Sequence, residues 1–158
     1  MDKNFNYLKE SERTLANSFY GDKIDAAYVM AKVNDAIIAL QELDKIKKSS
    51  FYNKDNGIFT ENPVVSEDDI VSVLSNDKQK AINLFHGIIG IATEAGELLE
   101  AITKSISNLE QLDLVNLKEE SSDIFWYLAI LARECDTTFE KIQNANIEKL
   151  KHLITSMK

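Results

Sequence analysis

Two pairs of carboxylates in the middle of the chain have a spacing that can support metal chemistry. Glu94 and Glu97 are three residues apart, and Glu120 and Asp123 repeat that spacing. Residues three apart on a helix project from the same face, so two neighbouring helices can bring all four carboxylates together. Buried carboxylates need a compensating partner, and clustered carboxylate oxygens suit Mg²⁺ or Mn²⁺. We therefore predict a metal site held by Glu94, Glu97, Glu120 and Asp123.

A solvated helix face is the ordinary explanation of a single Glu-x-x-Glu pair. Here two acid pairs lie on consecutive predicted helices, and the first is flanked by the apolar segments IGIAT and LLEAI. A carboxylate-bridged di-iron bundle would place Glu-x-x-His on two helices, and neither acid pair has such a histidine. An oxygen-only site favours hydrolytic or phosphoryl chemistry over redox chemistry. Glu100 and Glu119 extend the acidic cluster, and we expect Glu100 to be solvated or to support a ligand.

Helical periodicity accounts for most of the chain. The pattern predicts helices over residues 23–47, 67–74, 77–107, 116–134 and 138–156. The segment 48–63 contains Ser, Asn, Asp, Gly and the only proline, which predicts a loop. Helices with short connections indicate an all-α bundle, and 158 residues favour a single domain.

The helix predicted over residues 77–107 is the centre of this bundle. Its middle carries apolar or small residues on almost every side, so it should be buried. Gly87, Gly90 and Gly96 lower its helix propensity, and we expect them to permit close approach of another helix or of substrate. One chain offers few helices to cover so many apolar faces, so we predict a homo-oligomer.

Composition narrows the possible partners. The formal net charge of −8 gives no electrostatic reason to bind nucleic acid or an anionic membrane. A phosphate-bearing substrate would approach such a chain only through a cation. Cys135 is the single cysteine, and no segment is apolar and long enough to span a bilayer. We expect a cytoplasmic protein in which Cys135 is inert.

The acid pairs and their surroundings resemble the MazG-like family of all-α nucleoside triphosphate pyrophosphohydrolases. The segment LFHGIIGIATEAGELLEAI is similar to the first metal helix of that family, LDLVNLKEESSDIFWYLAILAREC to its second, and NANIEKL to its closing helix. The similarity covers roughly residues 80–151, whereas residues 1–75 form an N-terminal helical extension with no such likeness.

The resemblance implies both an architecture and a reaction. It implies a four-helix core completed by oligomerisation, as a homodimer or as a homotetramer built from dimers. The implied reaction is hydrolysis of a nucleoside or deoxynucleoside triphosphate between the α and β phosphates. It further implies that Tyr127, Asn146 and Lys149 contact the triphosphate. The chain departs from the family after the lysine, because it reads KLKHLITSMK, with His152 near the position of an expected arginine.

The same residues suggest a mechanism and leave three alternatives open. Mg²⁺, or Mn²⁺ in its place, would offset charge repulsion and activate a water molecule, while Glu97 or Glu120 would orient or deprotonate that water. One alternative is a dUTP-specific all-α pyrophosphatase, and another is a phosphoribosyl-ATP pyrophosphohydrolase. The third is a non-catalytic bundle that binds metal and nucleotide or a protein partner. We expect Phe125 and Trp126 to be core residues and His86 to be partly buried with its polar atoms satisfied.

Overall fold

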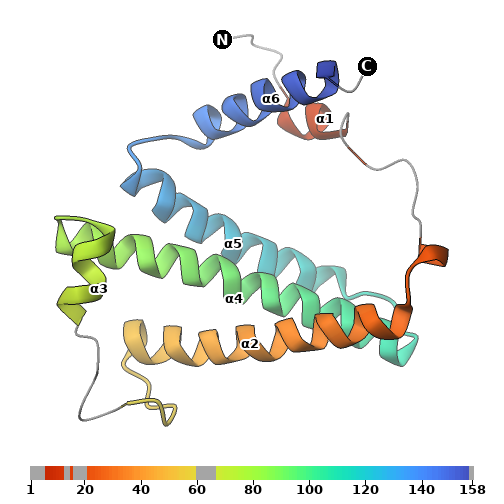
Figure 1. Cartoon of the computed structure of the whole chain (residues 1–158), viewed down its shortest axis with the longest axis horizontal. Helices are drawn as coiled ribbons and strands as arrows, with labels where there is room; N and C mark the ends of the chain where they lie inside the picture. Colours follow the sequence, from red (N-terminus) through yellow and green to blue (C-terminus); the bar gives the residue numbers. More distant parts are fainter. Residues whose placement is uncertain (1–5, 13–14, 16–20, 60–66, 157–158) are drawn as a thin grey trace.

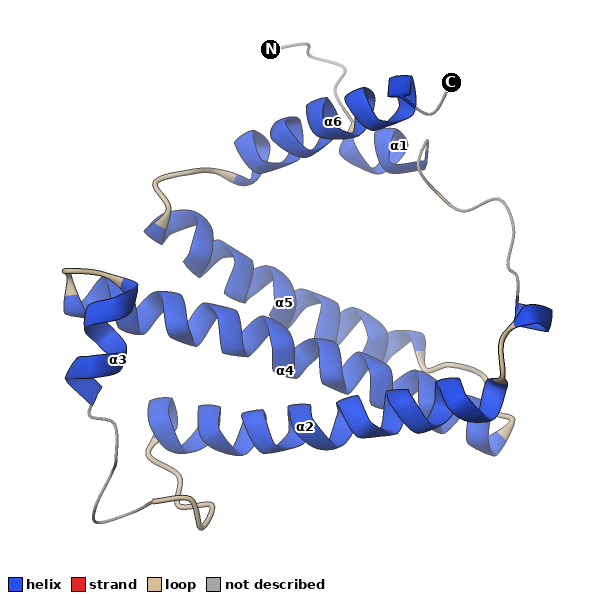
Figure 2. Ribbon diagram, viewed as in Figure 1, coloured by secondary structure: helices blue, strands red, loops and turns tan. Residues whose placement is uncertain are grey.

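The structure is a computed structural model, and it describes residues 6–12, 15, 21–59 and 67–156. The described part consists of helices and connecting loops, with no strand in these ranges (Figure 2). The elements are α1 (Tyr7–Ser11), η2 (Gly21–Lys23), α2 (Ala26–Tyr52), α3 (Glu67–Leu74), α4 (Lys78–Asn108), α5 (Leu114–Glu134) and α6 (Phe139–Ser156). The predicted all-α class is confirmed.

Aspartate side chains determine where the three long helices begin. Asp25, Asp77 and Asp113 each accept hydrogen bonds from backbone N–H groups of the first turn of α2, α4 and α5. These N–H groups have no partner within the helix, so a carboxylate at the cap stabilises the start. The predicted start of α5 near Asn116 was therefore two residues late, because Asp113 is its cap.

Helix α2 continues into the segment that we predicted to be a loop. It begins at Ala26 and ends at Tyr52, where Asn53 adopts a left-handed conformation with φ of 52°. The predicted loop of residues 48–63 is thus correct only from Asn53 to Phe59 among the described residues, because residues 60–66 lie outside them. Ser and Lys near a helix end do not stop a helix by themselves, whereas asparagine tolerates the left-handed cap.

Helices α2, α4 and α5 form the core of the chain. They lie side by side and alternate in direction, with α4 in the middle (Figure 1). Gly87, Gly90 and Gly96 of α4 all face its neighbours and explain the close approach, and a β-carbon on Gly87 would lie 2.7 Å from Cδ2 of Leu131 on α5. A β-carbon on Gly90 would lie 2.2 Å from the Tyr127 ring on α5, and one on Gly96 would lie 2.8 Å from Cβ of Leu40 on α2. Close helix packing is therefore the role of these glycines.

Helix α6 lies apart from this core and packs against α1 (Figure 1). Tyr7 donates a hydrogen bond of 3.0 Å to Oδ1 of Asn146, which joins the two helices. Two aromatics of α5 are nevertheless largely exposed: Phe125 is 59% exposed, with its ring centroid 6.1 Å from that of Phe139, and Trp126 is 55% exposed, with its ring centroid 6.0 Å from that of His86 on α4. Our prediction of core positions for these two aromatics was wrong for the single chain. Tyr127 is the aromatic that α4 buries.

Helix α3 packs against α4 (Figure 1), and its bounds match the predicted helix of residues 67–74. None of the described helices combines the length and the apolar character that crossing a membrane requires.

Candidate metal centre and active site

Three of the four predicted metal ligands come together where α4 and α5 pack. Carboxylate oxygens of Glu94, Glu97 and Glu120 all lie within 4.8 Å of one another. We call these three residues the acid cluster. Glu94 and Glu120 are buried, whereas Glu97 is exposed. Helical spacing aligns the two glutamates of α4, and the antiparallel neighbour α5 supplies the third.

Asp123, the fourth predicted ligand, is placed differently. It lies on α5 three residues beyond Glu120, but its side chain is exposed and is not part of the acid cluster. Its role as a ligand therefore remains a prediction based on spacing and on the family resemblance.

Hydrogen bonds hold two members of the acid cluster in place. Asn116 donates a bond of 2.8 Å from Nδ2 to Oε1 of Glu120, one helical turn away. Lys47, on α2, donates a bond of 2.8 Å from Nζ to Oε1 of Glu94 and a bond of 2.7 Å to the hydroxyl of Thr93. The Thr93 hydroxyl donates in turn to the backbone oxygen of Gly90 at 2.9 Å.

Asp44 completes the surroundings of the lysine. Its Oδ1 lies 3.2 Å from Nζ of Lys47, and its Oδ2 pairs with Lys48. Burial favours the neutral form of Asp44, but the hydrogen bonds from Lys48 and Lys47 outweigh this effect, so the pKa of Asp44 lies below its ordinary value. Oδ1 of Asp44 is nevertheless buried without a well-aligned hydrogen bond. The positive charge of Lys47, 3.2 Å away, offsets the cost of burying this oxygen.

The proximity of the carboxylates changes their acidity. Burial, followed by the charge of Glu97, raises the pKa of Glu120 to about 7. Partial removal of the Glu97 carboxylate from water, although the side chain is exposed overall, and then the charges of Glu94 and Asp44 also raise the pKa of Glu97. Repulsion between neighbouring carboxylates, which a cation would relieve, is therefore the second cause of both shifts after burial. For Lys47, burial disfavours the charged form, but the hydrogen bond and the charge of Glu94 outweigh it, so the pKa of Lys47 is raised.

A polar cavity of about 660 Å³ opens beside the acid cluster. Its lining includes Glu97 and Glu120 together with the amide side chains of Gln41 and Gln111 and the amine of Lys104. Amide and amine groups can form hydrogen bonds with a polar ligand, and a volume of this size suits a small molecule. The cavity is therefore the natural place for a substrate that reaches the acid cluster.

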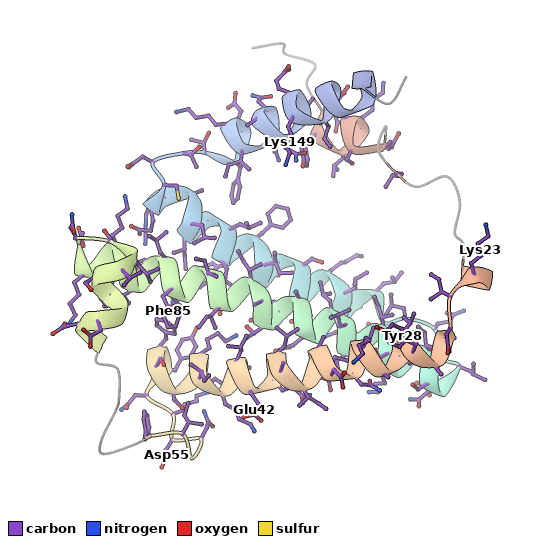
Figure 3. All side chains as sticks on the ribbon, in the orientation of Figure 1. Lys23, Tyr28, Glu42, Asp55, Phe85 and Lys149 are labelled. Carbon is purple, nitrogen blue, oxygen red and sulfur yellow. The ribbon has the colours of Figure 1, made fainter. Side chains whose placement is uncertain are left out.

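The three residues that the resemblance assigns to the triphosphate do not line this cavity. Tyr127 is 5% exposed and packs against Gly90, with its ring centroid 5.5 Å from Nζ of Lys47. Asn146 is bound to Tyr7, and Lys149 is exposed on α6 (Figure 3). Helix α6 packs on α1, so the single chain does not bring Asn146 and Lys149 to the acid cluster.

An aromatic group surrounds His86, two turns before Glu94 on α4. The His86 ring stacks on Phe51 at a centroid distance of 4.1 Å, and its Nε2 lies 3.2 Å from the hydroxyl of Tyr52. Burial, followed by the charge of Lys47, lowers the pKa of His86. The predicted partial burial of His86 is confirmed, and its Nε2 has a partner in Tyr52.

Sequence reasoning missed Lys47 and Asp44. A signal was present, because Ile37, Leu40, Asp44, Lys47 and Phe51 follow one another at spacings of three and four residues. Such spacing defines one face of a helix, and the apolar members indicate that this face is buried. A lysine and an aspartate on a buried face must pair, which points to them as parts of a polar site.

The fold and the acid cluster together define a class of protein. It is an all-α bundle in which neighbouring helices bring carboxylates together beside a polar cavity, and the oxygen-only donor set suits a hard divalent cation. Residues 88–153 match the family model of the MazG nucleotide pyrophosphohydrolase domain, so this part of the chain is MazG-like and the resemblance is confirmed. The match includes the acid cluster and α5, and it indicates a nucleotide pyrophosphohydrolase. No curated protein and no solved structure gave a significant match.

Proposed function

We propose that the protein hydrolyses a nucleoside or deoxynucleoside triphosphate to the monophosphate and pyrophosphate, with Mg²⁺ as its metal. The observation that carries the proposal is the acid cluster, whose oxygens converge to within 4.8 Å beside a cavity large enough for a small molecule. A triphosphate is repelled by carboxylates unless a cation lies between them, so the acidity of the site itself favours a metal-assisted reaction.

The donor set fits Mg²⁺. All three clustered donors are carboxylate oxygens, which Mg²⁺ prefers, and Mn²⁺ accepts the same ligands. In the proposal Glu94, Glu97 and Glu120 hold the metal, and Asp123 joins them from the adjoining turn of α5. When bound, the metal offsets the charge of the phosphates and lowers the pKa of a water molecule.

The proposed role of the protein in the chemical step is to orient water and accept its proton. Glu97 and Glu120 are our candidates, because they line the cavity and their pKa values lie above the ordinary range. A general base works best when its pKa lies near the operating pH. We propose that the amides of Gln111 and of Gln41, whose Nε2 donates to Oε2 of Glu100 at 3.3 Å, help to hold the nucleoside in the cavity.

The contacts proposed for the rest of the phosphate chain need more than one copy of the protein. Tyr127, Asn146 and Lys149 are assigned to the triphosphate by the family resemblance, but they do not line the cavity. We propose a homodimer or homotetramer that brings α6 of one copy to the cavity of another. The exposed aromatic side chains of Phe125 and Trp126 on α5 support such an assembly.

We further propose that the chain acts as one domain. The family match begins at residue 88, but α2 packs along α4 and supplies Lys47 and Asp44 to the acid cluster. The N-terminal extension of residues 1–75 would then be part of the active unit.

Product analysis with isotopic label tests the proposed reaction. The purified protein should release pyrophosphate from at least one member of a panel of canonical and modified nucleoside triphosphates, including dUTP. In ¹⁸O-labelled water the label should enter the monophosphate, because attack occurs at the α phosphorus. Release of orthophosphate and a diphosphate would contradict the proposal, and so would tight nucleotide binding without turnover on any triphosphate.

A further inference from the structure

Lys47 supplies a buried positive charge directly to the acid cluster. It is 4% exposed, and its Nζ lies 2.8 Å from Oε1 of Glu94, 2.7 Å from Oγ1 of Thr93 and 3.2 Å from Oδ1 of Asp44. Its Nζ donates hydrogen bonds to Thr93 and Glu94 and forms an ion pair with Asp44, so oxygens from both α2 and α4 surround it. The lysine is therefore held from both helices, at the point where they pack.

The charges around Lys47 explain why it lies there. Glu94 is also buried, and it faces Glu97 and Glu120 within the acid cluster. A buried carboxylate close to two others is strongly unfavourable without a positive charge nearby. Lys47 provides that charge from within the chain, from a helix that lies outside the family match.

We propose that Lys47 is a built-in counter-ion, a positioning residue that holds Glu94 and stabilises the acid cluster when no metal is bound. The inference rests on the proposed metal site. Lys47 and the bound metal would then both offset the negative charges of the acid cluster. A chain that lacks the lysine charge must depend more strongly on the metal for its stability.

The test compares melting temperatures with and without metal. Lys47→Met preserves most of the side-chain length and removes the charge. In EDTA its melting temperature should fall by about 5–15 °C, because one partner of a buried ion pair is lost. Saturating Mg²⁺ or Mn²⁺ should then raise the melting temperature of the variant by more than it raises that of the wild type. If Lys47 had a merely structural role, its loss would lower the melting temperature by the same amount in EDTA and in saturating metal.

A matched control and a double variant make the test specific. Lys45→Met removes an exposed lysine of the same helix, which is paired with Glu42 at 2.6 Å, and it should behave like the wild type. Lys47→Met combined with Glu94→Gln removes both charges of the pair, and in EDTA it should melt at a higher temperature than Lys47→Met alone. This comparison remains decisive if the single variant folds only with metal.

Two outcomes would overturn the inference while leaving the metal site intact. One is a metal-dependent rise of the same size in Lys47→Met and in the wild type, and the other is a double variant no more stable than the single one. Because melting needs no turnover, a normal metal response without pyrophosphate release would overturn the proposed reaction and leave the role of Lys47 supported. Absence of any Mg²⁺ or Mn²⁺ response in the wild type would overturn the metal site together with the inference.

Discussion

Gly90 of α4 lies directly against the ring of Tyr127 on α5, with no room for a side chain between them. A β-carbon at position 90 would lie 2.2 Å from both Cδ1 and Cε1 of the ring. The contact fixes how closely the two helices that carry the acid cluster approach each other. A glycine that lowers helix propensity is thus what permits the spacing of the metal site.

Gly90→Ala should destabilise the protein, although alanine is the better helix former by about 1 kcal/mol. The added methyl group forces the Tyr127 ring or the helix axis to move, and overpacking of this kind costs about 1–3 kcal/mol. Urea denaturation measures the free energy of unfolding. Combining Gly90→Ala with Tyr127→Ala should cost less than the sum of the two single changes. A more stable Gly90→Ala variant would show that the contact does not limit packing.

Turnover should require a divalent metal. Chelation with excess EDTA should abolish pyrophosphate release, and added Mg²⁺ or Mn²⁺ should restore it, because the acid cluster repels a triphosphate in the absence of a cation. The pyrophosphate assay that identifies the substrate serves for this measurement. Full turnover in EDTA would rule out the metal assignment.

Glu97→Gln and Asp123→Asn should each lower turnover by at least about 100-fold at saturating Mg²⁺, since loss of a metal ligand removes both charge and geometry. Metal-free Glu97→Gln should be no less stable than the wild type, because the raised pKa of Glu97 shows that its charged form is unfavourable there. Glu119→Gln, which removes an exposed acid next to Glu120, is the matched control and should retain activity. Near wild-type turnover in Asp123→Asn would exclude this residue as a ligand.

The stability of the metal-free protein should depend on pH through Glu120. The ordinary pKa of 4.5 rises to about 7 in the folded chain. The folded state therefore binds the proton more tightly, so this contribution to stability is fully present below pH 4.5 and is lost as the pH rises towards about 7.

The pH prediction is measured as a difference between the wild type and Glu120→Gln. Thermal melting in EDTA should show the wild type losing stability relative to the variant between pH 4.5 and 7. Mg²⁺ should reverse much of this loss at pH 7, because the metal stabilises the charged carboxylate. Parallel stability curves for the two proteins across this range would contradict the raised pKa.

The protein should form at least a dimer in solution. Helix α5 exposes Phe125 and Trp126, and the side chain of Ile88 on α4 is 54% exposed. Exposed apolar groups of this size normally mark an interface. Light scattering at micromolar concentration measures the mass, and Trp126→Ser should shift the equilibrium towards the monomer. A wild-type monomer would contradict the proposed route by which Asn146 and Lys149 reach the cavity.

The sequence by itself determined the helical class and most of the acid cluster. Helix start signals, such as the capping-box pattern of Thr137 and Glu140, predicted α3 and α6 to within a residue, because such signals are local and need no knowledge of neighbours. Likewise, the spacing of Glu94 and Glu97 places them on one face of any helix that contains them. That the helix of Glu120 would be the neighbour of α4 followed from the short connection between them.

Only the tertiary structure decided which charges meet and which aromatics are buried. Lys47 lies 47 residues before Glu94 in the chain, so no local sequence pattern could predict that their side chains meet. Tyr127 is buried and Trp126 is exposed, although they are adjacent in the sequence. The reason is that Gly90 leaves space on α4 for the ring of Tyr127. Local spacing determines the face of a helix on which a side chain lies. Which helices pack together, and which side chains then meet, depends on how their surfaces fit, and that fit exists only once the chain has folded.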